Sequence, residues 1–276
     1  MTHYKDYIAD ADREAAIVAH RGAWHGAPEN SLAAIERAIT IGADIVELDI
    51  RKSADGELFI MHDDTLSRMA GIERDAETFS MAELQAIALR EDDGGEHRAT
   101  TDQRVPTLKQ ALEVVRGRIF ADLDLKDRDL FSEVAACARE MNAASYVDLK
   151  THVMTREDLG WVRAQNIDGV PFMAMSRLTA EGLHETMALL SDIKPFMCEM
   201  RFDRVETIAD NKGLFRDAGM ALWMNTLNQV GSGEWRDDKA LVDPDSIWGR
   251  LIDAGISVFQ TDEPEALKTY LEGRRS

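Results

Sequence analysis

The stretch that decides the fold runs from residue 16 to residue 50 and reads AIVAHRGAWHGAPENSLAAIERAITIGADIVELDI. It opens with a short apolar run, 16–20, and closes with another, 44–50, and both are typical of buried strands. Between them, Ser31 is expected to cap a helix that continues to about Gly42, because apolar residues recur there at helical spacing. This order of strand, helix and strand predicts a parallel sheet covered by helices.

The same alternation continues to the end of the chain. Further strand candidates are 58–62, 118–125, 146–150, 170–175, 195–200, 221–225 and 257–261, with helical patterns that include 108–115, 130–141, 180–190 and 205–218. Nine strand candidates are one more than a closed barrel of eight strands needs, so one must be peripheral or wrong. Polar residues follow the strands from residue 20 to residue 262. This spread favours a (β/α)8 TIM barrel over an open doubly wound sheet, because all strand ends of a barrel face one mouth.

The segment from about 64 to 106 is different in character. It is polar and charged and contains the run EDDGGE at 91–96. We interpret it as a small insertion after the third strand segment, with one short helix near 81–89. The prediction is therefore a single barrel domain over 1–276 that carries this insertion.

Composition and charge exclude several classes of partner. The chain has 32 basic and 51 acidic residues and a formal net charge of −19, which argues against nucleic acid or an anionic membrane as the partner. Any site for a small anion must supply its own cations. No apolar run is long enough to span a membrane and the first residues show no secretory signal, so we expect a cytoplasmic protein. Two isolated cysteines, Cys137 and Cys198, predict neither a disulfide framework nor a zinc site.

Carboxylates recur at a spacing of two in two predicted strands. Glu47 and Asp49 point to the same face of their strand and Leu48 to the other. Two carboxylates aimed at one spot repel unless a cation joins them, and their oxygens suit Mg²⁺ or Ca²⁺. An exposed acidic strand end would have the same spacing. In the second strand Asp122, Asp124 and Lys126 share one face, and an ion pair between Asp124 and Lys126 is not expected to account for these charges.

Two histidines follow apolar runs close to these carboxylates. His20 and His62 could supply a general base and a general acid, because imidazole titrates near neutrality. Arg21 follows His20 directly and offers a forked donor for phosphate oxygens. Four other histidines lack such neighbours, and we interpret them as surface or loop residues: His25, His97, His152 and His184.

Trp223 and Asn225 end another predicted strand and share one face. Trp223 is either the apolar wall of a substrate pocket or part of the core. The sequence contains no P-loop, no dinucleotide fingerprint, no GxSxG and no HExxH, so it shows no machinery for nucleotide-dependent phosphoryl transfer, dinucleotide redox chemistry or serine hydrolysis.

The motifs as a set resemble the glycerophosphodiester phosphodiesterase family. The match rests on HRG (20–22), PENS (28–31), GADIVELD (42–49) and HDDTL (62–66), and further on VPTL (105–108), DLK (124–126), WMN (223–225) and TDEP (261–264). The resemblance implies a TIM barrel that hydrolyses small-molecule glycerophosphodiesters to glycerol 3-phosphate and an alcohol with one divalent cation.

The resemblance also implies roles for individual residues. It places acid–base catalysis on His20 and His62, and the metal on Glu47, Asp49 and Asp124. The substrate-binding set that it implies is Arg21, Lys126, Trp223, Glu29 and Asn30, with Arg21 and Lys126 on the phosphate. The family usually has glutamate where this chain has Asp124, so the ligand reaches the ion through water or the ion shifts, and the choice between Mg²⁺ and Ca²⁺ stays open.

Two other functions compete with this prediction. A lysophospholipid phosphodiesterase like sphingomyelinase D would need an apolar loop at the mouth, and the 64–106 segment is too charged for that. A non-catalytic ligand-binding barrel would not need both His20 and His62. Either histidine could start as the base, and the attacking oxygen could be water or the 2-hydroxyl of the glycerol.

Overall fold

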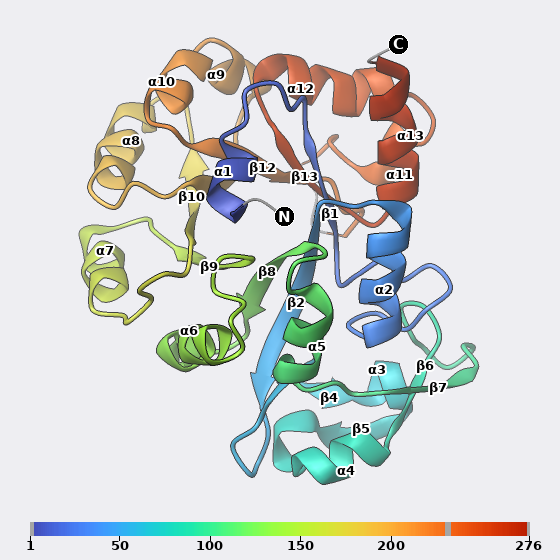
Figure 1. Ribbon diagram of the computed structural model, residues 1–276. Helices are drawn as coiled ribbons and strands as arrows, with labels where there is room; N and C mark the ends of the chain where they lie inside the picture. Colours follow the sequence, from blue (N-terminus) through green and yellow to red (C-terminus); the bar gives the residue numbers. More distant parts are fainter. Residues whose placement is uncertain (1–2, 230–232, 275–276) are drawn as a thin grey trace.

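The computed structural model describes residues 3–229 and 233–274, and its centre is a closed parallel barrel (Figure 1). The strands follow one another in the order β1, β13, β12, β11, β10, β9, β8 and β2, and pairing of β1 with β2 closes the ring. Their bounds are β1 Ala16–Ala19, β2 Ile45–Lys52, β8 Phe120–Leu125, β9 Val147–His152, β10 Phe172–Leu178, β11 Met197–Phe202, β12 Ala221–Asn225 and β13 Val258–Thr261. The predicted (β/α)8 barrel is therefore confirmed.

The ninth strand candidate is peripheral. It forms β3 (Leu58–Ile60), which pairs antiparallel with the end of β2. Only a short turn separates the two strands, and a parallel crossover needs a dozen residues or more. β3 is therefore a hairpin partner outside the ring.

Helices surround the barrel, as Figure 1 shows. They are α2 Leu32–Ile41, α5 Leu108–Val115, α6 Phe131–Glu140, α7 Arg156–Arg163, α8 Leu183–Ser191, α9 Val205–Ala209, α10 Lys212–Asp217, α11 Asp237–Ala240, α12 Arg250–Ala254 and α13 Pro264–Arg274, with short helices η2 Arg128–Leu130 and η3 Asp245–Gly249. Ser31 caps α2 as predicted: its hydroxyl accepts a hydrogen bond from Ala34 N at 3.1 Å. The single helix predicted over 205–218 is wrong, because α9 ends before Asp210 and α10 begins at Lys212.

Alternation along the strands separates the two faces of the barrel wall. Leu48 and Leu123 point outward into the apolar layer under the helices, while Phe120 and Trp223 belong to a separate cluster inside the barrel. The N-terminal helix α1 (Tyr4–Ile8) closes one end of that interior and lies in front of the strands in Figure 1. Its Tyr4 ring stacks on Phe120 with 4.5 Å between the ring centroids. An active site is therefore expected at the other end of the barrel, where the carboxyl ends of the strands lie.

The insertion contains more regular structure than predicted. Its elements are β4 Thr65–Leu66, α3 Ser67–Ala70, β5 Ile72–Asp75, η1 Ala76–Thr78, α4 Met81–Ala86, β6 Ala88–Arg90 and β7 Thr100–Arg104. The predicted helix near 81–89 exists but ends three residues early, since Ile87 is extended and leads into β6. The apolar side chains of the insertion form a cluster with Phe59 of β3 and Met61, which follows β3 directly.

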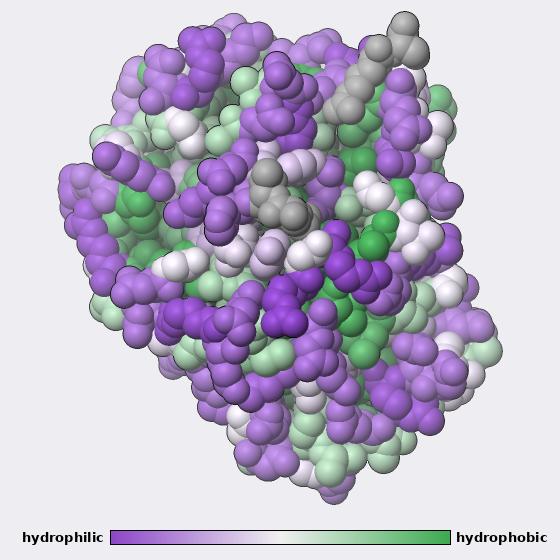
Figure 2. All heavy atoms as spheres, viewed as in Figure 1, coloured by the Kyte–Doolittle hydropathy of each residue, from purple (hydrophilic) through white to green (hydrophobic). Residues whose placement is uncertain are grey.

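Polar and charged side chains cover most of the face seen in Figure 2, with apolar atoms in scattered patches. This agrees with the strongly acidic composition. Within the ranges that the structure describes, no helix has both the length and the apolar content that crossing a bilayer requires.

Candidate active site

Three carboxylates from two neighbouring strands converge at the barrel mouth. Glu47 and Asp49 project from β2 and Asp124 from β8, and Asp49 and Asp124 are register partners. One oxygen of each lies within 4.8 Å of one oxygen of each of the others. Glu47 and Asp49 are 1% exposed. Both lie inside β2, because the strand continues to Lys52 instead of ending at Ile50 as predicted.

The donor set fits a hard divalent cation. Burial and the nearby charge of Asp49 raise the pKa of Glu47 to about 8, so the two carboxylates resist joint ionisation without a positive charge between them. Carboxylate oxygens are the ligands that Mg²⁺ and Ca²⁺ prefer. Glu47, Asp49 and Asp124 are therefore the residues that would hold such an ion.

Two cations are already placed against these carboxylates. The Nζ atom of Lys126 lies 2.6 Å from Asp49 Oδ1 and 2.9 Å from Asp124 Oδ2. Arg21 Nε lies 3.4 Å from Asp49 Oδ2. Burial opposes ionisation of Asp49, but the charges of Lys126 and Arg21 hold its pKa below the usual range. The expectation that an ion pair would not account for the charges on β8 needs correction, because Lys126 does pair with Asp124.

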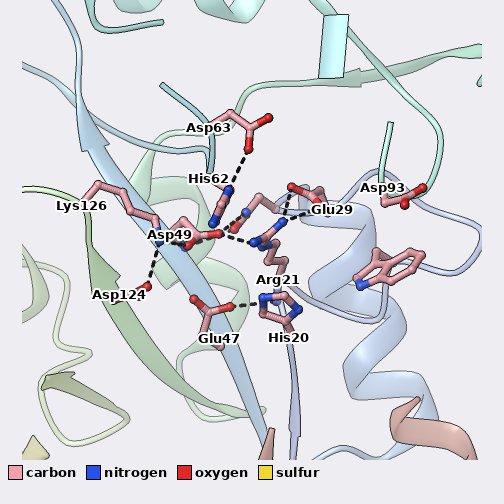
Figure 3. A network of polar contacts seen from close by, with 12 residues as sticks. His20, Arg21, Glu29, Glu47, Asp49, His62, Asp63, Asp93, Asp124 and Lys126 are labelled. Atoms are coloured by element: carbon pink, nitrogen blue, oxygen red, sulfur yellow. Dashed lines mark hydrogen bonds and ion pairs between the residues drawn. The ribbon is translucent and has the colours of Figure 1, made fainter. Parts of the chain in front are cut away.

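Each of the two histidines has a carboxylate on its Nδ1 atom. His20 Nδ1 lies 2.7 Å from Asp262 Oδ1, and His62 Nδ1 lies 2.7 Å from Asp63 Oδ1. Such a partner favours the tautomer with the proton on Nδ1 and leaves Nε2 for a reacting group. Figure 3 shows both imidazoles beside the group formed by Glu47, Asp49 and Arg21.

A cavity of about 320 Å³ lies against these groups. Both histidines line it, together with Arg21, Glu29 and Asp262. Glu29 is held between two guanidinium groups, with Arg21 Nη1 at 3.1 Å and Arg68 Nη2 at 2.6 Å. The cavity therefore brings acid–base groups and fixed cations to one space beside the three carboxylates.

Local backbone geometry sets this arrangement. Gly22 has φ +84°, and a Cβ there would lie 2.6 Å from Ala34 Cβ, so only glycine fits. Arg21 and Asn30 also have positive φ, and Asn30 N donates to Arg21 O at 2.8 Å. Arg21 N in turn donates to Glu47 Oε2 at 3.0 Å. The turns at 20–22 and 28–31 thus fix both the arginine and a carboxylate of the candidate metal site.

Two predicted substrate residues are placed elsewhere. Asn30 is 2% exposed, and its Nδ2 donates to Asp49 Oδ2 at 2.6 Å, so it orients a carboxylate and does not line the cavity. Trp223 is fully buried inside the barrel and its Nε1 donates to Asn225 Oδ1 at 2.6 Å. This burial supports the interpretation of Trp223 as part of the core. Asp122, the other carboxylate on that face of β8, lies 2.7 Å from Lys150 Nζ.

Trp24, Arg68 and Asp262 are among the cavity-lining residues that sequence reasoning missed. Trp24 donates from Nε1 to Asp262 Oδ1 at 3.1 Å, and Arg68 donates from Nε to Asp63 Oδ2 at 2.8 Å. Asp262 had a signal, since it directly follows a strand and belongs to the TDEP motif, whereas nothing in the local sequence marks Trp24 or Arg68.

Comparison with known families decides the relationship. The sequence model of the glycerophosphoryl diester phosphodiesterase family matches residues 20–166, which is more than half of the chain. The chain belongs to this family. A second model, described as a domain of unknown function, matches residues 172–271.

Curated relatives of the phosphodiesterase family match part of the chain. The chain is 36% identical over 107 residues to a glycerophosphodiester phosphodiesterase of Caldanaerobacter subterraneus subsp. tengcongensis, which covers 38% of this chain and 42% of that protein. It is 40% identical over 120 residues to human glycerophosphodiester phosphodiesterase 1, covering 42% of this chain and 34% of that protein. The matched stretch thus spans less than half of either relative.

Solved structures of this family share the fold along the whole chain. A glycerophosphoryl diester phosphodiesterase from Parabacteroides distasonis superposes with a TM-score of 0.76 at 22% identity, covering 98% of this chain and 92% of that one. A phosphodiesterase from Oleispira antarctica, solved in complex with the product sn-glycerol-3-phosphate, gives 0.67 at 22% identity, covering 93% and 96%. At this identity the likeness establishes the barrel alone.

Proposed function

We propose that the protein hydrolyses glycerophosphodiesters to glycerol 3-phosphate and an alcohol with the help of one divalent cation, Mg²⁺ or Ca²⁺. The observation that carries this proposal is the convergence of Glu47, Asp49 and Asp124 beside two imidazoles, each of which is oriented by its own carboxylate. Family membership supports it, as does the glycerol phosphate in the related Oleispira structure.

The cationic groups account for binding of the phosphate. Arg21 and Lys126 place positive charge directly beside the carboxylates of this strongly acidic chain. A divalent cation, when bound, would neutralise charge on the non-bridging phosphate oxygens in the transition state. Arg21 also meets Glu29, so its guanidinium is held in place before the substrate arrives.

The two histidines account for the proton transfers. One imidazole takes the proton from the attacking oxygen, and the other gives a proton to the leaving alcohol as its bond to phosphorus breaks. Asp262 and Asp63 keep Nε2 of each ring free for this exchange. If water attacks, glycerol 3-phosphate forms directly; if the glycerol 2-hydroxyl attacks, a cyclic phosphate forms first and water opens it.

The insertion does not favour a lysolipid substrate. Its large apolar side chains, among them Leu66, Met69 and Leu84, pack into a cluster of their own. The exposed large hydrophobic residues in the described part of the chain are Met154, Leu214, Leu241 and Val242, none of which belongs to the insertion. Residues 64–106 therefore do not form the exposed apolar loop that binding of a lipid chain at the mouth would need.

The test is a panel of glycerophosphodiesters with choline, ethanolamine, inositol and glycerol head groups, assayed by release of glycerol 3-phosphate. We expect hydrolysis that EDTA abolishes and that Mg²⁺ or Ca²⁺ restores. His20→Ala and His62→Ala should each lower kcat by about 10²–10⁴-fold, while His184→Ala, a change on the exposed face of α8, should match the parent. Parent-level rates in either active-site variant would refute the acid–base assignment, and hydrolysis of lysolipids alone would refute the substrate class.

A further inference from the structure

A second and larger cavity opens at the carboxyl ends of β9, β10 and β11. Its volume is about 780 Å³, against about 320 Å³ for the cavity at the histidines. Residues that follow β12 line both cavities: Leu227 and Asn228 line the smaller one, and Gly233 and Trp235 line the larger one. The two cavities therefore lie next to each other at one barrel mouth.

Two arginines stand side by side in the wall of the larger cavity. Arg177 of β10 and Arg201 of β11 are register partners in the parallel sheet. Met175 and Glu199, two residues earlier, are also partners, so the four side chains belong to the same face of the two strands. Both arginines line the cavity and both are exposed. Like charges on directly opposed strand positions repel each other, so this pairing costs stability unless something neutralises it.

Nothing in the described ranges 3–229 and 233–274 neutralises either guanidinium. Within these ranges neither guanidinium forms an ion pair or a hydrogen bond with another residue, although the chain has 51 acidic residues. The two acidic groups in the cavity wall already have partners. Glu199 accepts from Asn225 Nδ2 at 3.1 Å and lies 3.1 Å from Lys150 Nζ, and Asp203 accepts from Arg204 N at 2.8 Å.

The remaining wall suits the carbon body of an organic anion. Met175 lies on the same strand face as the arginines, and Met175 and Trp235 both line the cavity with apolar side chains. His152, interpreted from sequence as a surface or loop residue, lines the same cavity. A paired guanidinium site recognises phosphate especially well, because each fork can bind two of its oxygens.

We propose that this cavity binds a phosphate group carried by the leaving alcohol, so that the preferred substrates are glycerophosphodiesters whose alcohol is itself phosphorylated. The inference rests on the proposed function, because it assigns the glycerol phosphate half to the smaller cavity and the phosphorylated alcohol to the larger one. Arg177 and Arg201 determine specificity and take no part in breaking the ester bond.

The decisive pair of substrates is glycerophosphoinositol and glycerophosphoinositol 4-phosphate, which differ only in the second phosphate. We expect the parent protein to favour the phosphorylated substrate by at least about tenfold in kcat/KM, the effect of one well-formed charged contact. The double variant R177A/R201A should reduce that preference to less than twofold. The control R156A/R216A removes the same charge from side chains that are 81% and 83% exposed and should keep the preference.

Binding separates this inference from the catalytic proposal. Titration calorimetry of the same two compounds in EDTA measures affinity without turnover, so it remains informative if the parent hydrolyses neither. We expect at least tenfold tighter binding of the phosphorylated compound, lost in R177A/R201A and kept in R156A/R216A. Equal affinity of the parent for the two compounds, or a preference that survives in R177A/R201A, would overturn the inference even if both were hydrolysed.

Discussion

The two halves of the barrel mouth hold their positive charges in opposite ways. In the half built by residues 20–166, Arg21 and Lys126 each lie within 3.4 Å of a carboxylate of the candidate metal site. In the half built by residues 172–271, Arg177 and Arg201 have no such partner in the described part of the chain. Cations that are paired within the protein keep a fixed geometry before the substrate binds. Cations without a partner can instead pair with a negative group of the substrate.

A side chain of the second half also contacts a histidine of the first half. Asp262 follows β13 and holds His20, while the backbone N–H of Asp262 donates to Asp237 Oδ2 at 2.9 Å. Thr226 donates its hydroxyl to Asp237 Oδ1 at 2.6 Å. Residues of the second half therefore orient His20, a candidate catalytic group of the first half. Substitutions in the two halves should differ in the size of their effects.

The largest effect should come from the carboxylates of the first half. Glu47→Gln removes a charged ligand that would help to hold the ion. Because a bound ion stabilises the transition state by several kcal/mol, we expect kcat to fall by about 10²-fold or more. Glu73→Gln, on the exposed part of β5, is the matched control and should retain parent activity. The measurement is glycerol 3-phosphate release at saturating Mg²⁺ and Ca²⁺. Parent-level turnover by Glu47→Gln would show that the first half does not depend on this charge.

A smaller effect should follow from the positioning carboxylate of the second half. Asp262→Asn weakens the hydrogen bond that orients His20 and should lower kcat by about 10–100-fold, the range seen when a carboxylate partner of a metal-bound histidine is removed. KM should stay within about twofold, because Asp262 acts through the imidazole. Asp217→Asn, 75% exposed on α10, serves as control. A change in KM with kcat preserved would mean that Asp262 binds substrate and does not position His20.

The smallest effect concerns stability and its dependence on pH. Burial raises the pKa of Asp237 to about 7, well above its value of about 4 in an unfolded chain. The folded protein therefore keeps a proton that the unfolded chain releases, so this contribution is complete below pH 4 and is lost as the pH rises to 7. Its size is on the order of 1–4 kcal/mol.

Asp237→Asn cannot titrate and should lack this part of the pH dependence. Urea unfolding of parent and variant at pH 4.5 and pH 7.5 gives the comparison, since other groups contribute equally to both proteins. The free energy of unfolding should fall less between the two pH values in the variant. An identical fall in both proteins would show that Asp237 is ionised in the folded state.

Strand alternation predicted the candidate metal site well. Placing Glu47 and Asp49 on one face of β2, and Asp124 on the same face of β8, required only the period of two, and the parallel register then brought them together. For Trp223 the same rule gave two alternatives, because alternation gives the face of a strand and says nothing of depth along the barrel. Trp223 faces inward but lies below the mouth, among the buried side chains of the interior.

Other features depended on information that local sequence lacks. Arg68 reaches the cavity from the insertion, whose path over the mouth follows no periodic pattern. The meeting of Arg177 and Arg201 depends on the register of two strands separated by a helix, which a single sequence does not fix. The hairpin between β2 and β3, by contrast, follows from the short turn alone.

The most direct test of the central claim is a calorimetric titration of chelator-treated protein with Mg²⁺ and with Ca²⁺. The account predicts one bound ion per chain, with affinity at least about tenfold lower in Glu47→Gln, in line with the loss of one charged ligand. Glu73→Gln should bind as the parent does. A parent protein that binds neither ion, or a Glu47→Gln variant that binds as tightly as the parent, would contradict the claim that Glu47, Asp49 and Asp124 share a cation.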